Sequence, residues 1–253
     1  MMRLTEQRDA EVLATFCGSS LFGSYIMSRY TAYANEFSFA KCYIDRKDSI
    51  VVTALSVLEG SAVLLTSDRT DFEELSLALP LLSVQTLMTD SNNASCLPFP
   101  VIQEKQAFRY MGSKSALEAS SDAPLRDVYD LISASIPGNF SADEEAYLHF
   151  LSDFTFRRNR GLARMKTVVR NERVCACALT AAECASSAVI SGVACAQDCR
   201  GRGYGKSVVT ALAYELQNEK KQVHVVALND AAGAFYRRIG FVPAEKIVWL
   251  KIQ

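Results

Sequence analysis

One short segment carries most of the residues that could do chemistry. Residues 193–207 read VACAQDCRGRGYGKS, with a glycine at every second position near their end and three basic side chains. The glycines are Gly201, Gly203 and Gly205, and the basic residues are Arg200, Arg202 and Lys206. A helical pattern begins just after them, and the free N–H groups of a first helical turn attract anions. Because glycine lets the backbone approach a ligand closely, the segment predicts a phosphate-binding loop.

Two familiar phosphate-binding motifs do not fit this loop. A Walker loop needs a glycine where the chain has Arg200, and a dinucleotide fingerprint needs one where it has Lys206. The pattern that fits is Arg-x-x-Gly-x-Gly, formed by Arg200, Gly203 and Gly205. It resembles the coenzyme A pyrophosphate loop of the GNAT N-acetyltransferase superfamily. The alternative is a plain strand-to-helix turn.

A second motif follows in the order that this family has. The run 223–228, VHVVAL, is apolar and β-branched, which is typical of a buried strand, and Asn229 or Asp230 can cap the helix after it. The pattern N-x-x-A-x-x-F-Y-x-x-x-G-F resembles the second half of a GNAT core and is formed by Asn229, Ala232, Phe235, Tyr236, Gly240 and Phe241. The resemblance implies an α/β fold of the GNAT type, with a mixed central sheet flanked by helices.

The same resemblance implies acetyl-CoA as the acetyl donor and an amine of a small molecule or protein as the acceptor. The strand before the loop would hold the pantetheine arm and the thioester through its backbone, and the loop would hold the pyrophosphate. The residues that would bind coenzyme A are Val193, Ala194, Cys195, Arg200, Gly201, Arg202, Gly203, Tyr204, Gly205, Lys206 and Asn229. Tyr236 matches the tyrosine that protonates the leaving thiolate, a role that suits a hydroxyl with an ordinary pKa of about 10.

Each of these assignments has a plainer alternative. Neighbouring helix residues point about 100° apart, so we expect Phe235 in the core and Tyr236 in the cleft, although Tyr236 could itself be a core aromatic. Asn229 could serve only as a helix N-cap. For the whole protein, the alternative to an acetyltransferase is a catalytically inactive acyl-CoA-binding regulatory module.

The sequence identifies no general base. Glu183, Asp153 and the acidic run 143–145 are candidates, and we expect each of them to be a solvated surface charge. The two histidines lie far apart, and Cys175 and Cys177 alternate on an apparent strand, so we predict no metal site. We expect the eight cysteines to be reduced and mostly buried, with Cys199 set apart by its place in the cationic loop.

Composition limits the partners that the protein can have. Its 253 residues carry a net charge of −1 without any basic run, so we predict no nucleic acid and no anionic membrane surface as partners. The charged start, MMRLTEQRDAEV, argues against a signal peptide, and the apolar stretch 50–65 is too short and broken to span a bilayer. We expect a cytoplasmic protein, with acetyl-CoA and an amine acceptor as partners and a homodimer left open.

The chain reads as two similar halves. We predict a degenerate GNAT-like domain over residues 1–118 and an acetyl-CoA-binding GNAT domain over residues 119–253, joined by a polar linker at 112–124. The segments 54–64 and 178–190 match in part, and VQTLMTD parallels VHVVALND. No glycine lies between Leu65 and Leu82, so the first half should not bind coenzyme A in the family's way.

Capping and helix-breaking residues predict several helix ends and one loop. Thr5 and Thr70 are the expected N-caps of two helices in the first half, and Ser141 with Glu144 forms a capping box in the second. A helix that begins near Pro124 should be broken by Pro137-Gly138, and residues 91–100 should form a loop.

Overall fold

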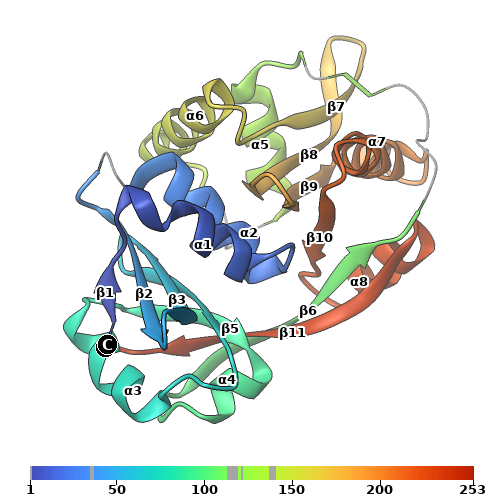
Figure 1. The fold of residues 1–253 in the computed structure, drawn as a ribbon. Coiled ribbons are helices and arrows are strands. Elements are labelled where there is room, and N and C mark those ends of the chain that lie inside the picture. The colour runs from blue at the N-terminus through green and yellow to red at the C-terminus, as the bar shows by residue number, and fades with distance from the viewer. Residues whose placement is uncertain (1, 35–36, 113–118, 121, 137–140) are drawn as a thin grey trace.

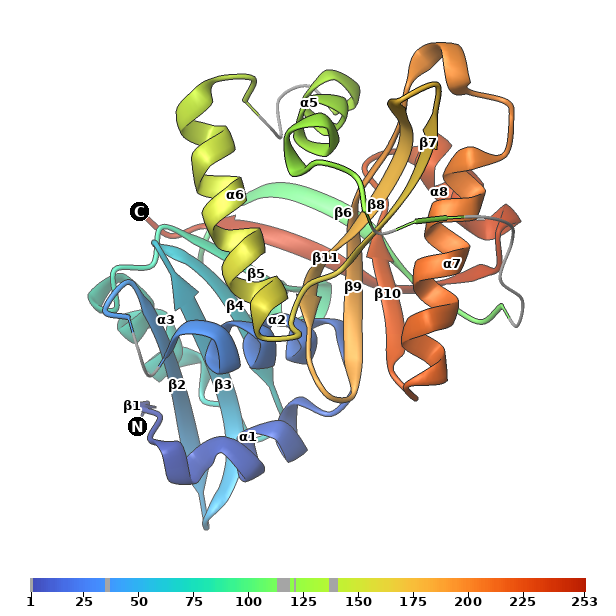
Figure 2. The ribbon, with the colours of Figure 1, turned by 90° about the horizontal axis from the view of Figure 1, so that it is seen from above.

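A single mixed sheet runs through the protein (Figures 1 and 2), whose computed structural model describes residues 2–34, 37–112, 119–120, 122–136 and 141–253. The strand order is β1-β2-β3-β4-β5-β11-β6-β10-β9-β8-β7. The strands are β1 (Arg3–Leu4), β2 (Ala40–Lys47), β3 (Ile50–Leu58), β4 (Ser61–Thr66), β5 (Thr86–Asp90), β6 (Val101–Tyr110), β7 (Met165–Arg170), β8 (Arg173–Glu183), β9 (Ser187–Cys195), β10 (Gln222–Val226) and β11 (Phe241–Lys251). The α-helices are α1 (Ala10–Cys17), α2 (Leu21–Arg29), α3 (Phe72–Leu81), α4 (Ser91–Ser95), α5 (Leu125–Ser135), α6 (Glu144–Asn159), α7 (Tyr204–Asn218) and α8 (Asp230–Arg238), and a π-helical turn, η2 (Tyr30–Ala34), continues α2.

The two halves repeat one arrangement of elements. In the first, β2, β3 and β4 form an antiparallel meander, and α3 leads to β5, which is parallel to β4. In the second, β7, β8 and β9 form the meander, and α7 leads to β10, which is parallel to β9. Each half then adds a short helix and a last strand, so the chain has the expected α/β fold with two similar halves in tandem.

The last strand of each half lies in the sheet of the other half. β6 belongs to the first half by sequence, yet it pairs with β10 of the second. β11 ends the second half and pairs with β5 of the first. β6 and β11 also pair with each other, and Figure 1 shows them side by side through the middle of the molecule. The sheet is continuous because these two strands are exchanged.

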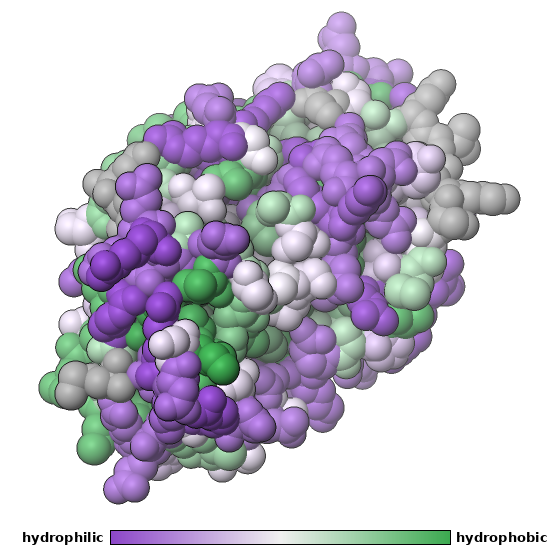
Figure 3. Space-filling model, viewed as in Figure 1, coloured by the Kyte–Doolittle hydropathy of each residue, from purple (hydrophilic) through white to green (hydrophobic). Residues whose placement is uncertain are grey.

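Helices cover the sheet on both faces. In the second half, α5 packs on β8 and β9, while α7 packs on β7 to β10 from the opposite side (Figure 2). α2 of the first half packs on β3 and β4 and also on β8 and β9. There the hydroxyl of Ser24 donates to that of Ser187 at 2.7 Å, within the buried contact between the halves. Figure 3 shows a face on which polar side chains surround smaller apolar areas.

Three of the expected helix caps are wrong, because a neighbouring aspartate does the capping or the helix starts later. Asp71, not Thr70, caps α3, and Asp143, not Ser141, caps α6. A carboxylate at these positions accepts the amide hydrogen bond and also suits the positive end of the helix dipole. Thr5 instead donates to the carbonyl of Cys42, and α1 begins only at Ala10.

The prediction of a loop over residues 91–100 is wrong for residues 91–95, which form the short helix α4. Asp90 ends β5 and accepts the amide hydrogen bond of Asn93, so one residue ends the strand and caps the helix. Pro124 directly precedes α5 as expected. The predicted break at Pro137-Gly138 and the predicted domain boundary at residue 118 lie outside the described residues, and the boundary stays a prediction.

Candidate functional site

Strand β9 extends beyond its parallel partner. The pairing of β10 with β9 ends at Val225 and Ile190, whereas β9 continues to Cys195. Over this last part β9 pairs only with β8, where Cys177 lies opposite Ala194. The β10-facing backbone of β9 is therefore not used by the described sheet from Ser191 onward. The Cys195 carbonyl accepts a hydrogen bond from Nε of Arg200 at 3.3 Å, and the backbone before it is open to an extended ligand.

Gly192 marks the place where the two strands separate. Its φ is +56°, in the region that favours glycine, and the register between β8 and β9 shifts nearby, between Cys177 and Leu179. A Cβ at this position would lie 2.7 Å from Cδ1 of Leu179 and 3.1 Å from Cδ1 of Ile132. The bulge therefore needs glycine both for its backbone angle and for its close packing against α5.

The glycine-rich loop ends as the N-terminus of α7. Gly203 is the N-cap, with φ of +83°, and Gly201 has φ of +77°. A Cβ at either position would have nothing within 4 Å, so both glycines face open space. The first amides of α7 have no partner inside the helix, and the side chains of Arg200 and Lys206 add positive charge nearby.

A pocket of about 480 Å³ lies between the free part of β9, the loop and α7. It brings together nine of the eleven residues predicted to bind coenzyme A: Val193, Ala194, Cys195, Arg200, Gly201, Gly203, Tyr204, Gly205 and Lys206. Arg202 does not line this pocket. Three further residues line it, namely Cys199, Phe235 and Arg238. Phe235 and Arg238 are three residues apart on α8, a spacing that places them on one helix face and could have been recognised in the sequence.

Asn229 occupies the N-cap of α8. Its side-chain oxygen accepts the amide hydrogen bond of Ala232 at 3.0 Å. It lines a separate, smaller pocket of about 150 Å³ together with Asp230 and Gly233. The capping alternative is therefore present in the structure, while its contact with a pantetheine arm stays a prediction.

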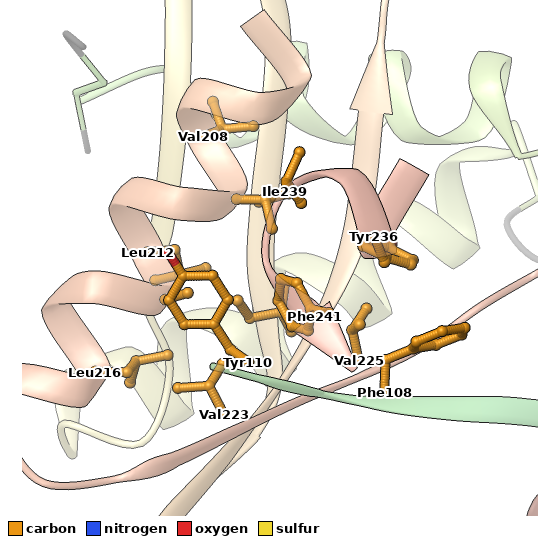
Figure 4. Close-up of a cluster of buried hydrophobic side chains, with 14 of the residues drawn as sticks. Phe108, Tyr110, Val208, Leu212, Leu216, Val223, Val225, Tyr236, Ile239 and Phe241 are labelled. Carbon is orange, nitrogen blue, oxygen red and sulfur yellow. The ribbon is translucent and has the colours of Figure 1, made fainter. Parts of the chain in front are cut away.

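Tyr236 is buried in the core of the second half, and the expected division between it and Phe235 is wrong. Tyr236 is only 6% exposed and lies beside Val225 and Phe108 (Figure 4). Phe235 is half-buried and lines the pocket instead. α8 packs on β6 and β11, so the helix face that carries Tyr236 meets Phe108 and Phe241. Burial raises the pKa of the Tyr236 hydroxyl, which therefore stays protonated at neutral pH.

The candidate general bases are engaged in other contacts. Glu183 is fully buried, not solvated as expected, and its carboxylate pairs with Arg164 and, at 2.7 Å, with Lys221. Asp143 caps α6. Asp153 accepts hydrogen bonds from Tyr33 and from Arg157. Glu183 and Asp143 therefore stabilise the fold and do not transfer protons at the pocket.

The described residues lack two features. They contain no group of three or more His, Cys, Asp or Glu placed to hold a metal ion. None of their helices combines the length and the apolar character that crossing a bilayer requires.

Residues 169–250 match the family described as FR47-like protein, and this range includes the pocket. No protein with a curated description matches the sequence.

Three solved structures are similar to the protein over the whole of its chain. A GNAT-family acetyltransferase from Colwellia psychrerythraea aligns over 100% of both chains, with 15% identity and a TM-score of 0.60. A tandem GNAT protein from the clavulanic acid biosynthesis pathway aligns over 100% of this chain and 98% of its own, with 14% identity and a TM-score of 0.61. A GCN5-related N-acetyltransferase from Sphaerobacter thermophilus aligns over 100% and 96%, with 14% identity and a TM-score of 0.65. These similarities show that the chain has the GNAT fold in tandem, and its residues 169–250 match the FR47-like family.

Proposed function

We propose that the protein transfers an acetyl group from acetyl-CoA to an amine. One observation supports this most: the free backbone of β9 and the cationic N-terminus of α7 line the same pocket. A strand edge suits an extended arm that carries amide groups, and a helix N-terminus suits phosphate. Coenzyme A combines these two features in one molecule.

The residues of the pocket fit coenzyme A in charge and in shape. Arg200, Lys206 and Arg238 supply three positive charges around the predicted pyrophosphate position. Gly201 and Gly203 leave space that a Cβ would fill. Phe235 and Val193 give the pocket an apolar side for the methylene groups of the arm. The volume of about 480 Å³ is within the usual range of small-molecule sites.

When bound, acetyl-CoA supplies an acetyl thioester, whose C–S bond breaks as a C–N bond forms and a proton passes from nitrogen to sulfur. The chain would orient the reacting carbonyl through the free amides of β9 between Ser191 and Cys195, and such positioned donors stabilise developing negative charge. Tyr236 would give its proton to sulfur and regain the proton that nitrogen releases, although burial, by raising the pKa of its hydroxyl, makes it a weaker donor.

The burial of Tyr236 also supports a second candidate, an inactive acyl-CoA-binding regulatory module, because Tyr236 does not line the pocket. Two measurements on one preparation separate the candidates: calorimetric binding of coenzyme A, and release of free thiol from acetyl-CoA with a panel of primary amines. Binding with amine-dependent thiol release supports the transferase. Binding without release for every amine supports the module, and absence of binding overturns both. The cytoplasmic location and the homodimer stay predictions.

A further inference from the structure

A second cavity, of about 690 Å³, lies where the two halves meet. Helices α5 and α6 form its second-half wall, and η2, β3 and the β3–β4 turn contribute from the first half. It shares no lining residue with the pocket at the N-terminus of α7. The side chains of the cavity can therefore serve a different ligand.

Aromatic rings form much of the cavity wall. The rings that line it are Tyr33, Phe37, Phe39, Tyr129, Phe150 and Phe156. Tyr33 stacks on Phe156 with 5.4 Å between the ring centroids, and Phe37 and Phe39 lie 5.0 Å apart. The guanidinium of Arg160 lies 3.5 Å from the centroid of Phe156, so one ring of this cluster already carries a cation on its face. Such a wall favours an apolar ligand body and tolerates a positive charge.

The charged residues of the cavity wall are acidic. Among the described residues that line it, Glu59 and Asp153 carry carboxyl groups, and none is a lysine or an arginine. The Asp153 carboxylate binds Arg157 through Oδ2, at 2.9 Å from Nε, and accepts the Tyr33 hydroxyl on Oδ1. Its side chain is still 45% exposed, so lone pairs remain available to an ammonium group.

The inner end of the cavity comes close, along β8, to the free part of β9. A smaller cavity of about 120 Å³ shares Tyr33, Leu58 and Asp153 with it and reaches Ala181 and Ala182 of β8. Leu179, two residues earlier on β8, pairs with Ser191, where the free part of β9 begins. At about 3.3 Å per strand residue, the inner end lies roughly 7 Å along β8 from that point. An amine held here is close to the predicted thioester position.

The inner end carries two cations. Arg29 donates to the carbonyl of Ser61 at 3.0 Å, and Arg157 donates to that of Ala181 at 3.2 Å. Both guanidinium groups are held by protein oxygens, but their charge still repels a second ammonium group. Nearby positive charge also favours the neutral form of an amine, which is the nucleophilic form.

We propose that this cavity is the acceptor site and that it takes a primary monoamine carried on an apolar body about the size of an aromatic ring. The inference rests on the proposed function, since an acceptor site presupposes acetyl transfer. The rings hold the body, Asp153 attracts the ammonium form, and Arg29 with Arg157 disfavours diamines.

Binding of three probes to the full chain, saturated with coenzyme A, tests the proposal by calorimetry. The probes are 2-phenylethylamine, its neutral analogue 2-phenylethanol, and the diamine putrescine. We expect 2-phenylethylamine to bind at least about tenfold more tightly than either of the others, a difference of about 1.4 kcal/mol.

Two variants test whether 2-phenylethylamine binds in this cavity. Phe39→Ala removes a ring that is 45% exposed, and Asp153→Asn removes the charge while keeping the shape. Each should weaken 2-phenylethylamine binding at least about tenfold and leave coenzyme A binding unchanged, and Asp153→Asn should not weaken 2-phenylethanol. Leu148→Ala is the matched control, because Leu148 is an exposed apolar residue of the same helix, α6, outside the cavity wall.

The outcomes separate this proposal from the proposed function. The acceptor site is overturned if putrescine binds as tightly as 2-phenylethylamine or more tightly, or if neither variant weakens 2-phenylethylamine binding. In that case, thiol release with another amine would still support the transferase. Failure of the chain to bind coenzyme A overturns the proposed function itself.

Discussion

The sulfur atoms of Cys175 and Cys199 lie 2.9 Å apart, with Cys175 on β8 and Cys199 in the wall of the pocket at the N-terminus of α7. Both residues are buried and both are free thiols. A disulfide bond is about 2.0 Å long, so the two sulfurs need to approach by only about 1 Å to be joined. The hydrogen bond to Cys175, together with burial, raises the pKa of the Cys199 thiol to about 11.

Mild oxidation with diamide, which takes up two electrons and two protons, should convert this pair into an intramolecular disulfide. The cross-link closes a loop of about 25 residues and should raise the free energy of unfolding by about 3 kcal/mol in urea titrations. The thiolate is the reacting form, so the rate of oxidation should rise with pH. Cys175→Ser should abolish this rise in the free energy of unfolding, whereas the control Cys96→Ser, at an exposed site, should not. A free energy of unfolding that oxidation leaves unchanged contradicts the prediction.

Gly205→Glu should abolish coenzyme A binding in a protein that stays folded. Gly205 lies in the first turn of α7 without a positive φ, and its added Cβ would meet only Phe235, at 3.8 Å. A carboxylate there suits the helix dipole but opposes the phosphates. We expect coenzyme A affinity to fall at least about 100-fold, with stability equal or higher. Gly205→Gln, of equal size, should lose much less, and equal losses in both variants would show that bulk rather than charge excludes the ligand.

Tyr236→Phe should lower kcat by about 10²–10⁴-fold if the hydroxyl donates the proton to sulfur. The change removes one oxygen from a buried ring and almost no volume, so the packing against Phe108 and Phe241 should survive. Steady-state kinetics with separate coenzyme A binding measure the effect. Tyr214→Phe, on the outer part of α7, is the control. A Tyr236→Phe variant with wild-type kcat at every pH would reduce Tyr236 to a packing residue.

Glu183→Gln should destabilise the protein without changing catalysis. Glu183 is fully buried between Arg164 and Lys221, and removing one member of a buried ion pair costs about 3 kcal/mol or more. Glu215 also pairs with Arg164 but is 39% exposed, so Glu215→Gln should cost less than about 1 kcal/mol. Chemical denaturation measures both variants. A fall in the kcat of folded Glu183→Gln would instead return Glu183 to the candidate bases.

The sequence predicted the glycine-rich loop and the start of α8 correctly, because their signals are local. Gly203 and Asn229 mark helix starts through backbone angle and capping, which depend on the nearest few residues. Nine of the predicted coenzyme A residues lie together for the same reason, since they are nearly contiguous in the chain.

What could not be predicted depends on tertiary packing. The orientation of Tyr236 depends on Phe108, a residue of the exchanged strand β6. The burial of Glu183 depends on Arg164 and Lys221, which come from distant segments. The cavity at the junction combines Tyr33 with Asp153, and no spacing in the sequence indicates that these two residues meet.

The pairing of β11 with β5 constrains the order in which the protein can fold during synthesis. Ile247 lies opposite Asp90, so the first-half sheet keeps an unpaired edge at β5 until the ribosome has made the last strand. Such an edge can pair with another nascent chain, and contacts between distant residues form slowly. Because β6 and β11 are exchanged between the halves, neither half can complete its sheet until β11 has been synthesised. A chain that ends before residue 241 therefore leaves the sheet of the first half incomplete as well.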